Sequence, residues 1–327
     1  MRVAILDDYQ RVALSMADWP SIGAGVSVHP FHDRLGTEDQ VAERLRNFDV
    51  IVAMRERTPL PATLIERLPL LKLIVTTGRR NAAIDVKAAA ARGVVVSGTS
   101  MLSQPPVELT WALILALARS IPRESAEMRD GGWQSTMGVG LHGKTLGVVG
   151  LGRLGTAVAR IGRAFGMDVI AWSQNLTREK TDAAGVELVG KDTLFQRADV
   201  VTVHLVLSER TRGIVGEREL SLMKPGAFLI NTARGPIVDE HALIHALRHS
   251  VIAGAALDVF DEEPLPADHP LRRLEHALLT PHLGYVTTEN YRLAYGEAVE
   301  DIRAFLAGAP IRVIEPVDAG SVRTRQV

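Results

Sequence analysis

The fold of this chain is decided by the stretch Thr145-Leu-Gly-Val-Val-Gly150-Leu-Gly-Arg-Leu-Gly155. A short β-branched run leads directly into a G-x-G-x-x-G motif, and a helical pattern follows over Thr156–Phe165. Gly150 permits a tight turn, Gly152 lets a pyrophosphate approach the backbone, and Gly155 lets the helix lie close to the strand. The unpaired N–H groups at the helix N-terminus favour an anion. The stretch therefore predicts a dinucleotide-binding strand, turn and helix.

Strand-like runs continue downstream of this motif. They are Val169–Trp172, Val200–Val203, Phe228–Ile230, Ala253–Asp258 and Ala277–Leu279. Together with the first strand they make six, the number that a complete dinucleotide-binding sheet uses. We therefore expect a Rossmann domain over residues 99–284.

The N-terminal part alternates short strand-like runs with helical patterns. The runs are Val3–Leu6, Val50–Ala53, Leu73–Val75 and Val94–Val96, and the helical patterns are Thr37–Phe48, Pro61–Leu68 and Ile84–Arg92. This alternation predicts a second parallel sheet covered by helices. A helix over Thr288–Leu306 and a strand-like piece at Ile311–Ile314 are too small to fold alone, so we expect them to pack on this N-terminal block.

The predicted class is thus α/β, with two doubly wound parallel-sheet domains. The dinucleotide-binding domain is inserted into a discontinuous, flavodoxin-like substrate domain made of residues 1–98 and 285–327.

Composition excludes several classes of function. The chain has 327 residues, 46% of them hydrophobic, and 37 Lys and Arg against 38 Asp and Glu. A net charge of -1 offers no general attraction for nucleic acid or an anionic membrane, so we expect neither as a partner. The absence of Cys excludes a thiolate metal site and a cysteine nucleophile, and we expect no metal. Asp7 and Asp8 interrupt any signal peptide, and the longest apolar run, Trp111–Ala118, is too short for a membrane span, which favours the cytoplasm.

The end of the second Rossmann strand bears on the choice of cofactor. Ser173 lies 23 positions after Gly150, where the acidic residue that binds the ribose hydroxyls is expected. The sequence there is Ser173-Gln174-Asn175, followed by the cations Arg178 and Lys180. A carboxylate would repel a 2′-phosphate, and none is present. NADP or NAD is therefore compatible with the chain, and the loop favours NADP.

Three polar segments end the last predicted strands. They are Asn231-Thr-Ala-Arg-Gly-Pro236, Leu257-Asp-Val-Phe-Asp-Glu-Glu-Pro264 and Leu279-Thr-Pro-His-Leu-Gly284. Ligands of doubly wound sheets lie outside the carboxyl ends of the strands, so we expect these segments to converge. An Arg can hold the carboxylate of a 2-oxo acid in a bidentate contact, and a His beside a carboxylate can protonate the carbonyl oxygen as hydride arrives.

With the glycine turn, these motifs resemble the D-isomer-specific 2-hydroxyacid dehydrogenase family, which includes glyoxylate/hydroxypyruvate reductases and D-lactate and phosphoglycerate dehydrogenases. The motifs G-x-G-x-x-G, N-x-A-R-G, L-D-V-F-x-x-E-P and T-P-H-x-G follow the family's order and spacing over nearly the whole chain. The resemblance implies that Arg234 anchors the substrate, that His282 is the general acid/base, and that Glu263 hydrogen-bonds His282.

The resemblance also implies a cofactor site. In it, Asp258 contacts the carboxamide side of the nicotinamide, and Arg153 and Leu154 meet the pyrophosphate. Two interpretations of His204 stay open: it contacts the cofactor, or it only ends its strand. Val206 stands where the family usually has Pro. The full set of expected cofactor-binding residues is Gly150, Gly152, Arg153, Leu154, Gly155, Ser173, Gln174, Asn175, His204, Leu205, Thr232, Asp258 and Gly284.

The chain departs from the family at the substrate-carboxylate loop. Instead of G-x-G-x-D-x-I-D it reads Gly78-Arg-Arg-Asn-Ala-Ala-Ile-Asp85, so that Arg80 replaces the second Gly and a Gly-dependent backbone angle is in question. We expect Arg55, Gly78, Arg79 and Arg80 to bind substrate.

A second reading of these arginines stays open. In it, they and Arg57 form ion pairs with Asp85, Glu56 or a partner subunit.

The leading functional prediction is an NAD(P)-dependent 2-oxoacid reductase or D-2-hydroxyacid dehydrogenase acting on a small-molecule acid. A formate dehydrogenase-like enzyme would pair the His with Gln where Glu263 stands. A cofactor-binding scaffold or corepressor with little turnover is the alternative from another class.

A homodimer is also expected. The helical stretch 107–119 is apolar around nearly its whole circumference, which suggests a covering partner. In relatives this region joins two subunits, so we expect Trp111 and the following arm, Arg123–Gln134, at the interface.

Overall fold

The computed structural model describes residues 1–316. The chain forms two compact units, one of Met1–Leu102 together with the segment from Thr287 onward, and one of Ser103–Val286. The boundaries between the units, after Leu102 and after Val286, lie a few residues beyond the expected ones at 98 and 284. Within residues 1–316, no helix combines the length and the apolar character needed to cross a lipid bilayer.

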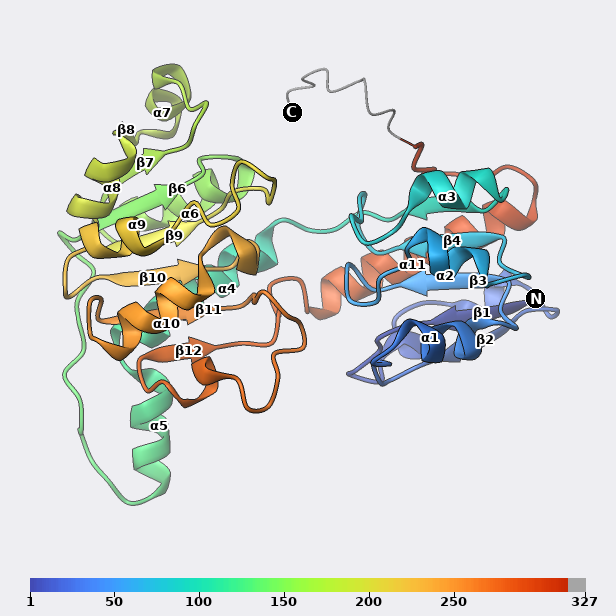
Figure 1. Cartoon of the computed structure of the whole chain (residues 1–327), viewed down its shortest axis with the longest axis horizontal. Helices are drawn as coiled ribbons and strands as arrows, with labels where there is room; N and C mark the ends of the chain where they lie inside the picture. The colour runs from blue at the N-terminus through green and yellow to red at the C-terminus, as the bar shows by residue number, and fades with distance from the viewer. Residues whose placement is uncertain (317–327) are drawn as a thin grey trace. The chain divides into compact units, whose positions relative to one another are not determined.

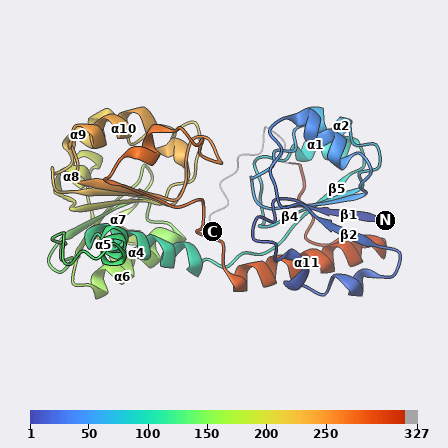
Figure 2. The same cartoon turned by 90° about the horizontal axis from the view of Figure 1, so that it is seen from below.

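The first unit is built on an all-parallel sheet with the order β2-β1-β3-β4-β5. Its strands are β1 (Arg2–Ile5), β2 (Ser27–Pro30), β3 (Val50–Ala53), β4 (Leu73–Thr76) and β5 (Val95–Gly98). Its helices are α1 (Glu38–Leu45), α2 (Ala62–Glu66), α3 (Val86–Ala91) and α11 (Thr288–Leu306), with short 3-10 turns at Ala13–Ser15 and Trp19–Ile22. Figure 2 shows α1 and α2 on one face of this sheet and α11 on the other.

Two details of the first unit differ from the sequence prediction. Edge strand β2 was not expected, because Ser27-Val-His-Pro30 lacks a β-branched run and ends in Pro, which edge strands tolerate. The piece Ile311–Ile314 is not a full strand. It lies along β5 through one antiparallel bridge between Ser97 and Val313 and a hydrogen bond from the Ile314 amide to the Val96 carbonyl.

The second unit contains a seven-stranded, all-parallel sheet with the order β12-β11-β10-β9-β6-β7-β8. Its strands are β6 (Thr145–Val149), β7 (Asp168–Trp172), β8 (Glu187–Leu188), β9 (Val200–Val203), β10 (Phe228–Asn231), β11 (Gly254–Leu257) and β12 (Ala277–Leu279). Six of them match the predicted runs. The seventh, β8, is a two-residue edge strand with too little sequence to leave a periodic signal.

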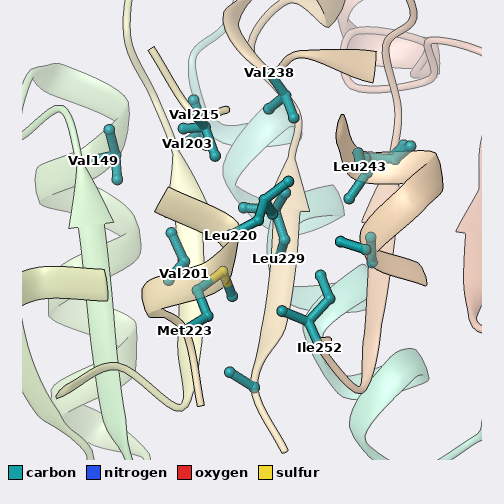
Figure 3. Packing of buried hydrophobic residues seen from close by; sticks show 14 of the residues in the cluster. Val149, Val201, Val203, Val215, Leu220, Met223, Leu229, Val238, Leu243 and Ile252 are labelled. Atoms are coloured by element: carbon teal, nitrogen blue, oxygen red, sulfur yellow. The ribbon is translucent and has the colours of Figure 1, made fainter. Parts of the chain in front are cut away.

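Helices cover both faces of this sheet (Figures 1 and 2). They are α4 (Gln104–Ala118), α5 (Ile121–Arg129), α6 (Arg153–Ala164), α7 (Arg178–Ala184), α8 (Lys191–Arg197), α9 (Glu217–Leu222) and α10 (Glu240–Arg248), with 3-10 turns at Gly235–Ile237 and Pro270–Arg273. Figure 3 shows the core under α9 and α10, where Leu220, Met223 and Leu243 meet Val201 and Leu229 of the sheet. This packing fixes the strand ends on which the polar segments stand.

Candidate active site

A histidine–carboxylate pair stands at the carboxyl end of the sheet of the second unit. His282 follows β12 and Glu263 follows β11, and the His282 Nδ1 lies 2.6 Å from the Glu263 Oε2. The other carboxylate oxygen of Glu263 accepts the amide N–H of Phe260 at 3.0 Å. A carboxylate at Nδ1 keeps a proton on that nitrogen, so Nε2 is left to exchange a proton with a ligand.

The electrostatics of the pair favour an ionised Glu263. Burial by itself would raise the pKa of Glu263, but the hydrogen bond and charge of His282, the Phe260 amide and the charge of Arg234 outweigh it and lower that pKa. The charge of Arg234 thus reaches Glu263, and the three residues expected to act together do lie in one neighbourhood.

The backbone of His282 is held in an uncommon conformation. Its φ is 53°, in the left-handed region that non-glycine residues rarely adopt. Buried Asp258 supports this loop, because its carboxylate accepts hydrogen bonds from the Thr280 hydroxyl at 2.6 Å and from the amides of Leu283 and Gly284 at 2.7 and 2.8 Å. Burial raises the pKa of Asp258, against the opposing effect of these bonds. Asp258 therefore holds the His282 loop, a role that the motif alone did not reveal.

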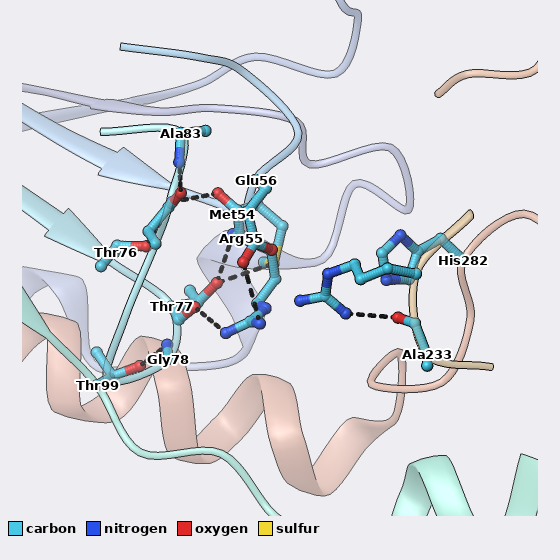
Figure 4. A network of polar contacts seen from close by, with 12 residues as sticks. Met54, Arg55, Glu56, Thr76, Thr77, Gly78, Ala83, Thr99, Ala233 and His282 are labelled. Atoms are coloured by element: carbon cyan, nitrogen blue, oxygen red, sulfur yellow. Dashed lines mark hydrogen bonds and ion pairs between the residues drawn. The ribbon is translucent and has the colours of Figure 1, made fainter. Parts of the chain in front are cut away.

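Arg234 is carried by the turn after β10. Asn231, at the end of the strand, donates to the Arg234 carbonyl at 3.0 Å and accepts the Ala233 amide at 3.0 Å. The Arg234 guanidinium donates to the Ala233 carbonyl at 2.7 Å (Figure 4). Gly235 must be glycine, because a Cβ there would run into the backbone of Phe260, in the segment that leads to Glu263. The N-x-A-R-G and L-D-V-F-x-x-E-P motifs are therefore packed against each other.

The glycine turn has the shape that a pyrophosphate cradle requires. Gly150 has φ 102°, and a Cβ there would lie 2.9 Å from the His204 carbonyl. A Cβ on Gly155 would run into the Gly150 carbonyl, so α6 approaches the turn closely. At Gly152 a Cβ would meet nothing within 4 Å, and no side chain caps the N-terminus of α6. Open space beside uncapped helix amides suits a phosphate group.

Among the other expected cofactor residues, His204 and Leu205 lie against Gly150 of this turn, and Thr232 follows β10. His204 continues the sheet after β9 through a hydrogen bond from its amide to the Val149 carbonyl, and its Nε2 lies 2.9 Å from the Thr202 hydroxyl. Burial lowers the pKa of His204 to about 4, so the ring is neutral. Thr232 bonds Thr110 of α4 through their hydroxyls at 2.8 Å, a contact that sequence reasoning missed.

The loop after β7 keeps its polar side chains available. Ser173 is half-buried, whereas Gln174, Asn175, Arg178 and Lys180 are exposed. Arg178 is the first residue of α7, and neither it nor Lys180 has an ion-pair partner among residues 1–316.

The expected substrate loop belongs to the first unit. Arg55 follows β3 and Gly78 follows β4. The Arg55 guanidinium donates to the Thr77 carbonyl at 3.2 Å and lies 3.4 Å from a Glu56 oxygen (Figure 4). Gly78 has φ 101°, but Arg80 is not among the residues with positive φ, so this loop does not require a second glycine.

The arginines of this loop have different surroundings. Arg79 and Arg80 are exposed and have no ion pair within the described part of the chain. Arg57 donates to the Asp7 carbonyl at 2.8 Å and lies over the ring of Tyr9. The predicted pairing with Glu56 is confirmed for Arg55.

Metal coordination has no support in residues 1–316, where no group of three or more His, Asp or Glu side chains could hold an ion.

Known proteins resemble this chain closely. Residues 111–284 match the family model described as D-isomer specific 2-hydroxyacid dehydrogenase, NAD binding domain. The chain is 41% identical over 255 residues to a glyoxylate reductase of Aeropyrum pernix, covering 75% of this chain and 76% of that protein. It is 40% identical over 276 residues to a D-3-phosphoglycerate dehydrogenase of Methanocaldococcus jannaschii, covering 83% of this chain but only 52% of that relative, so it spans about half of its length.

A solved structure shows the same architecture. The phosphoglycerate oxidoreductase of Vibrio cholerae superimposes with a TM-score of 0.90 at 37% identity, covering 94% of this chain and 100% of that one. The predicted family and fold class are therefore confirmed, and the matched NAD-binding domain indicates a nicotinamide cofactor. The histidine–glutamate pair, the glycine turn and these matches lead to one conclusion: the chain belongs to the D-isomer-specific 2-hydroxyacid dehydrogenase family.

Proposed function

We propose that this chain interconverts a 2-oxo acid and a D-2-hydroxy acid with NADP or NAD. The observation that carries the proposal is the 2.6 Å contact between His282 and Glu263, on the same sheet as the glycine turn. A nicotinamide cofactor, when bound, supplies or accepts the hydride. Gly150, Gly152, Arg153, Leu154 and Gly155 would hold its pyrophosphate, with Thr232, His204 and Leu205 beside the same strand ends.

Each residue of the chain then has a defined task. Arg234 binds the substrate carboxylate and polarises the carbonyl. His282 gives the Nε2 proton to the carbonyl oxygen during reduction and takes a proton from the hydroxyl during oxidation. Glu263 stays ionised and stabilises the imidazolium. Asp258 and Gly284 hold the loop, and their contact with the nicotinamide side stays a prediction. Arg55, Gly78, Arg79 and Arg80 of the first unit stay predicted to bind the acid.

NADP is the favoured cofactor of this proposal. Ser173, Gln174 and Asn175 offer neutral hydrogen-bonding groups where a repelling carboxylate would stand, and Arg178 and Lys180 are cations without ion pairs in the described chain. Without a carboxylate to repel the 2′-phosphate, the loop can accept NADP as well as NAD, and a nearby cation would favour the phosphate of NADP.

The enzyme is further proposed to act as a homodimer. Large apolar side chains of α5 and the following arm are exposed: Ile121 and Met128 each 54%, Trp133 74% and Met137 95%. Trp111 does not belong to this surface. It is buried, stacks on Phe165 with ring centroids 4.9 Å apart, and packs within its own unit. The arm, rather than Trp111, is therefore the surface for a second copy.

The direct test compares turnover of glyoxylate, hydroxypyruvate, pyruvate and bulkier 2-oxo acids with NADH and NADPH. His282→Asn should lower kcat by roughly 10²–10⁴-fold, because proton transfer is lost, while cofactor binding followed by fluorescence stays near the parent's. Turnover of His282→Asn at the parent's rate would remove this residue from the mechanism. A parent that binds cofactor but turns over no 2-oxo acid would instead favour the scaffold alternative.

A further inference from the structure

Arg55 occupies a backbone conformation that needs outside support. Its φ is 52°, in the left-handed region, although it is a long side chain with a Cβ. Such residues persist only where the surrounding structure holds them, and they concentrate at ligand-binding positions. The question is which group of the chain holds Arg55.

The side chain of Asn81 is the most direct support. It is 8% exposed, and its Nδ2 donates to the Arg55 carbonyl at 2.5 Å and to the Thr76 hydroxyl at 2.9 Å. Its Oδ1 accepts the Ala83 amide at 2.9 Å. One buried amide therefore joins the end of β4 and the following loop to the backbone of Arg55, which lies 26 positions earlier in the chain.

Thr77 completes the support from the same strand end. Its hydroxyl accepts the Arg55 amide at 2.9 Å, and its carbonyl accepts the Arg55 Nη1 at 3.2 Å (Figure 4). Both backbone polar groups of Arg55 are thus bonded to side chains of the β4 loop. The guanidinium lies against Gly78, where a Cβ would collide with Nη1.

This arrangement leaves part of the guanidinium for a ligand. The Arg55 side chain is 20% exposed, and within residues 1–316 its guanidinium bonds the Thr77 carbonyl and a Glu56 oxygen. A guanidinium has five N–H groups, so some of them have no partner within residues 1–316.

We propose that Asn81 is a positioning residue that acts through Arg55. It fixes the left-handed backbone of Arg55, and so keeps the guanidinium at Gly78 to receive an anionic group of the substrate. The inference rests on the proposed function, in which Arg55 binds the 2-oxo acid. Asn81 itself touches no reacting atom.

The experiment measures KM and kcat for the best 2-oxo acid in Asn81→Ala, Arg55→Ala and the double variant. Asn81→Ala should raise KM by about tenfold or more with kcat within about twofold, because a displaced binding group weakens substrate and transition state alike. In the Arg55→Ala background the same substitution should add less than about twofold, because coupled residues are not additive. Full additivity of the two effects, or a parental KM in Asn81→Ala, would overturn the proposal.

Two further variants separate positioning from loss of folding. Asn81→Asp keeps the size of the side chain and the acceptor for Ala83 but loses the donor to Arg55, so it should also raise KM. Its buried carboxylate is expected to lower Tm, and far-UV circular dichroism at the assay temperature checks that the KM is measured on folded protein. Asp85→Ala removes a hydrogen bond at the end of the same loop, in which the Asp85 carboxylate accepts the Ala88 amide at the start of α3, and should leave KM unchanged.

Failure of the proposed function has a different signature. Binding of oxamate, an unreactive 2-oxo acid analogue, is measured by calorimetry with cofactor present and needs no turnover. If the parent turns over nothing but Asn81→Ala weakens oxamate binding only when Arg55 is present, the positioning role stands and the reaction does not. If Arg55→Ala changes neither KM nor oxamate binding, the inference is overturned while the dehydrogenase proposal remains.

Discussion

His282 combines a left-handed backbone with a side chain held by the half-buried carboxylate of Glu263. The φ of 53° turns the ring toward Glu263, and Asp258 secures the residues on both sides of it. The orientation of the ring is thus set by two acidic residues from one segment, Asp258 through the backbone and Glu263 through Nδ1. Such strained residues are typical of sites where geometry is held in advance of the ligand.

Glu263→Gln tests the electrostatic half of this arrangement. The lowered pKa of Glu263 keeps a negative charge beside His282, which favours the imidazolium that reduction consumes. The neutral amide removes this charge, so the upper pH limit of reduction should move to lower pH. The measurement is kcat/KM for 2-oxo acid reduction as a function of pH.

A matched control exists in the same unit. Glu240 pairs with His269 at 3.0 Å, and both side chains are 17% exposed. Glu240→Gln therefore changes a similar pair that does not contain His282 and should leave the pH profile unchanged. A parental profile in Glu263→Gln would show that the carboxylate does not tune the acid.

At the scale of elements, the residues proposed for the site stand on the connections after the strands, and the β7–α7 loop is the one expected to set the choice of cofactor. Ser173→Asp places a carboxylate where the ribose hydroxyls are expected. Charge repulsion should then lower kcat/KM for NADPH relative to NADH, starting from a parent that favours NADPH. Ser173→Ala, which removes the hydroxyl without adding charge, should change the ratio much less. A parent that favours NADH by tenfold or more would contradict the NADP preference.

The long helix α11 contains a second testable element, the buried carboxyl of Asp301. Burial raises the pKa of Asp301 to about 6, although Arg312 donates to it at 2.8 Å. Its Oδ2 has no hydrogen-bond partner in the described chain. In the unfolded chain the same group ionises near pH 4, so between about pH 4 and 6 the folded state binds more protons. The contribution of Asp301 to stability therefore falls as the pH rises through this window.

Asp301→Asn should reveal this dependence. The variant cannot ionise at this position, so the difference between its Tm and that of the parent should shift in favour of the variant between pH 4 and pH 7. The control is Glu43→Gln, which removes an exposed carboxylate of the same unit that pairs with Arg46 and should give a nearly constant difference in Tm. If the Tm difference between Asp301→Asn and the parent is also independent of pH, then ionisation of Asp301 does not destabilise the folded state.

At the scale of the whole molecule, the proposed dimer can be tested by sedimentation. A chain of 35.5 kDa should sediment at about twice that mass at micromolar concentration. Trp133→Glu charges the most exposed aromatic side chain of the arm and should shift the equilibrium to monomer. Leu14→Glu alters an exposed apolar residue of the first unit and should not. Sedimentation of the parent as a monomer would contradict the proposed dimer. The cytoplasmic location is not tested by this experiment and stays a prediction.

The sequence by itself determined the two parallel sheets, because buried parallel strands are continuous apolar runs that local composition reveals. It also located the glycine turn and the segments of Arg234, Glu263 and His282, whose motifs are contiguous. Short edge strands such as β8 could not be predicted, because two residues are too few to show a periodic hydrophobic pattern.

Only the tertiary structure decided which distant groups meet. Asp258 supports the His282 loop from another strand, Asn81 bonds the backbone of Arg55, and Arg312 pairs with Asp301. Trp111 turned inward, although its helix is apolar on every side. The contacts of Asp258 and Asn81 depend on how strand ends from separate parts of the chain are brought to one edge of a sheet, and those of Asp301 and Trp111 on how their helices pack. Local sequence patterns do not encode them, because a side chain's hydrogen-bond partner is set by the path of the backbone and not by its neighbours in sequence.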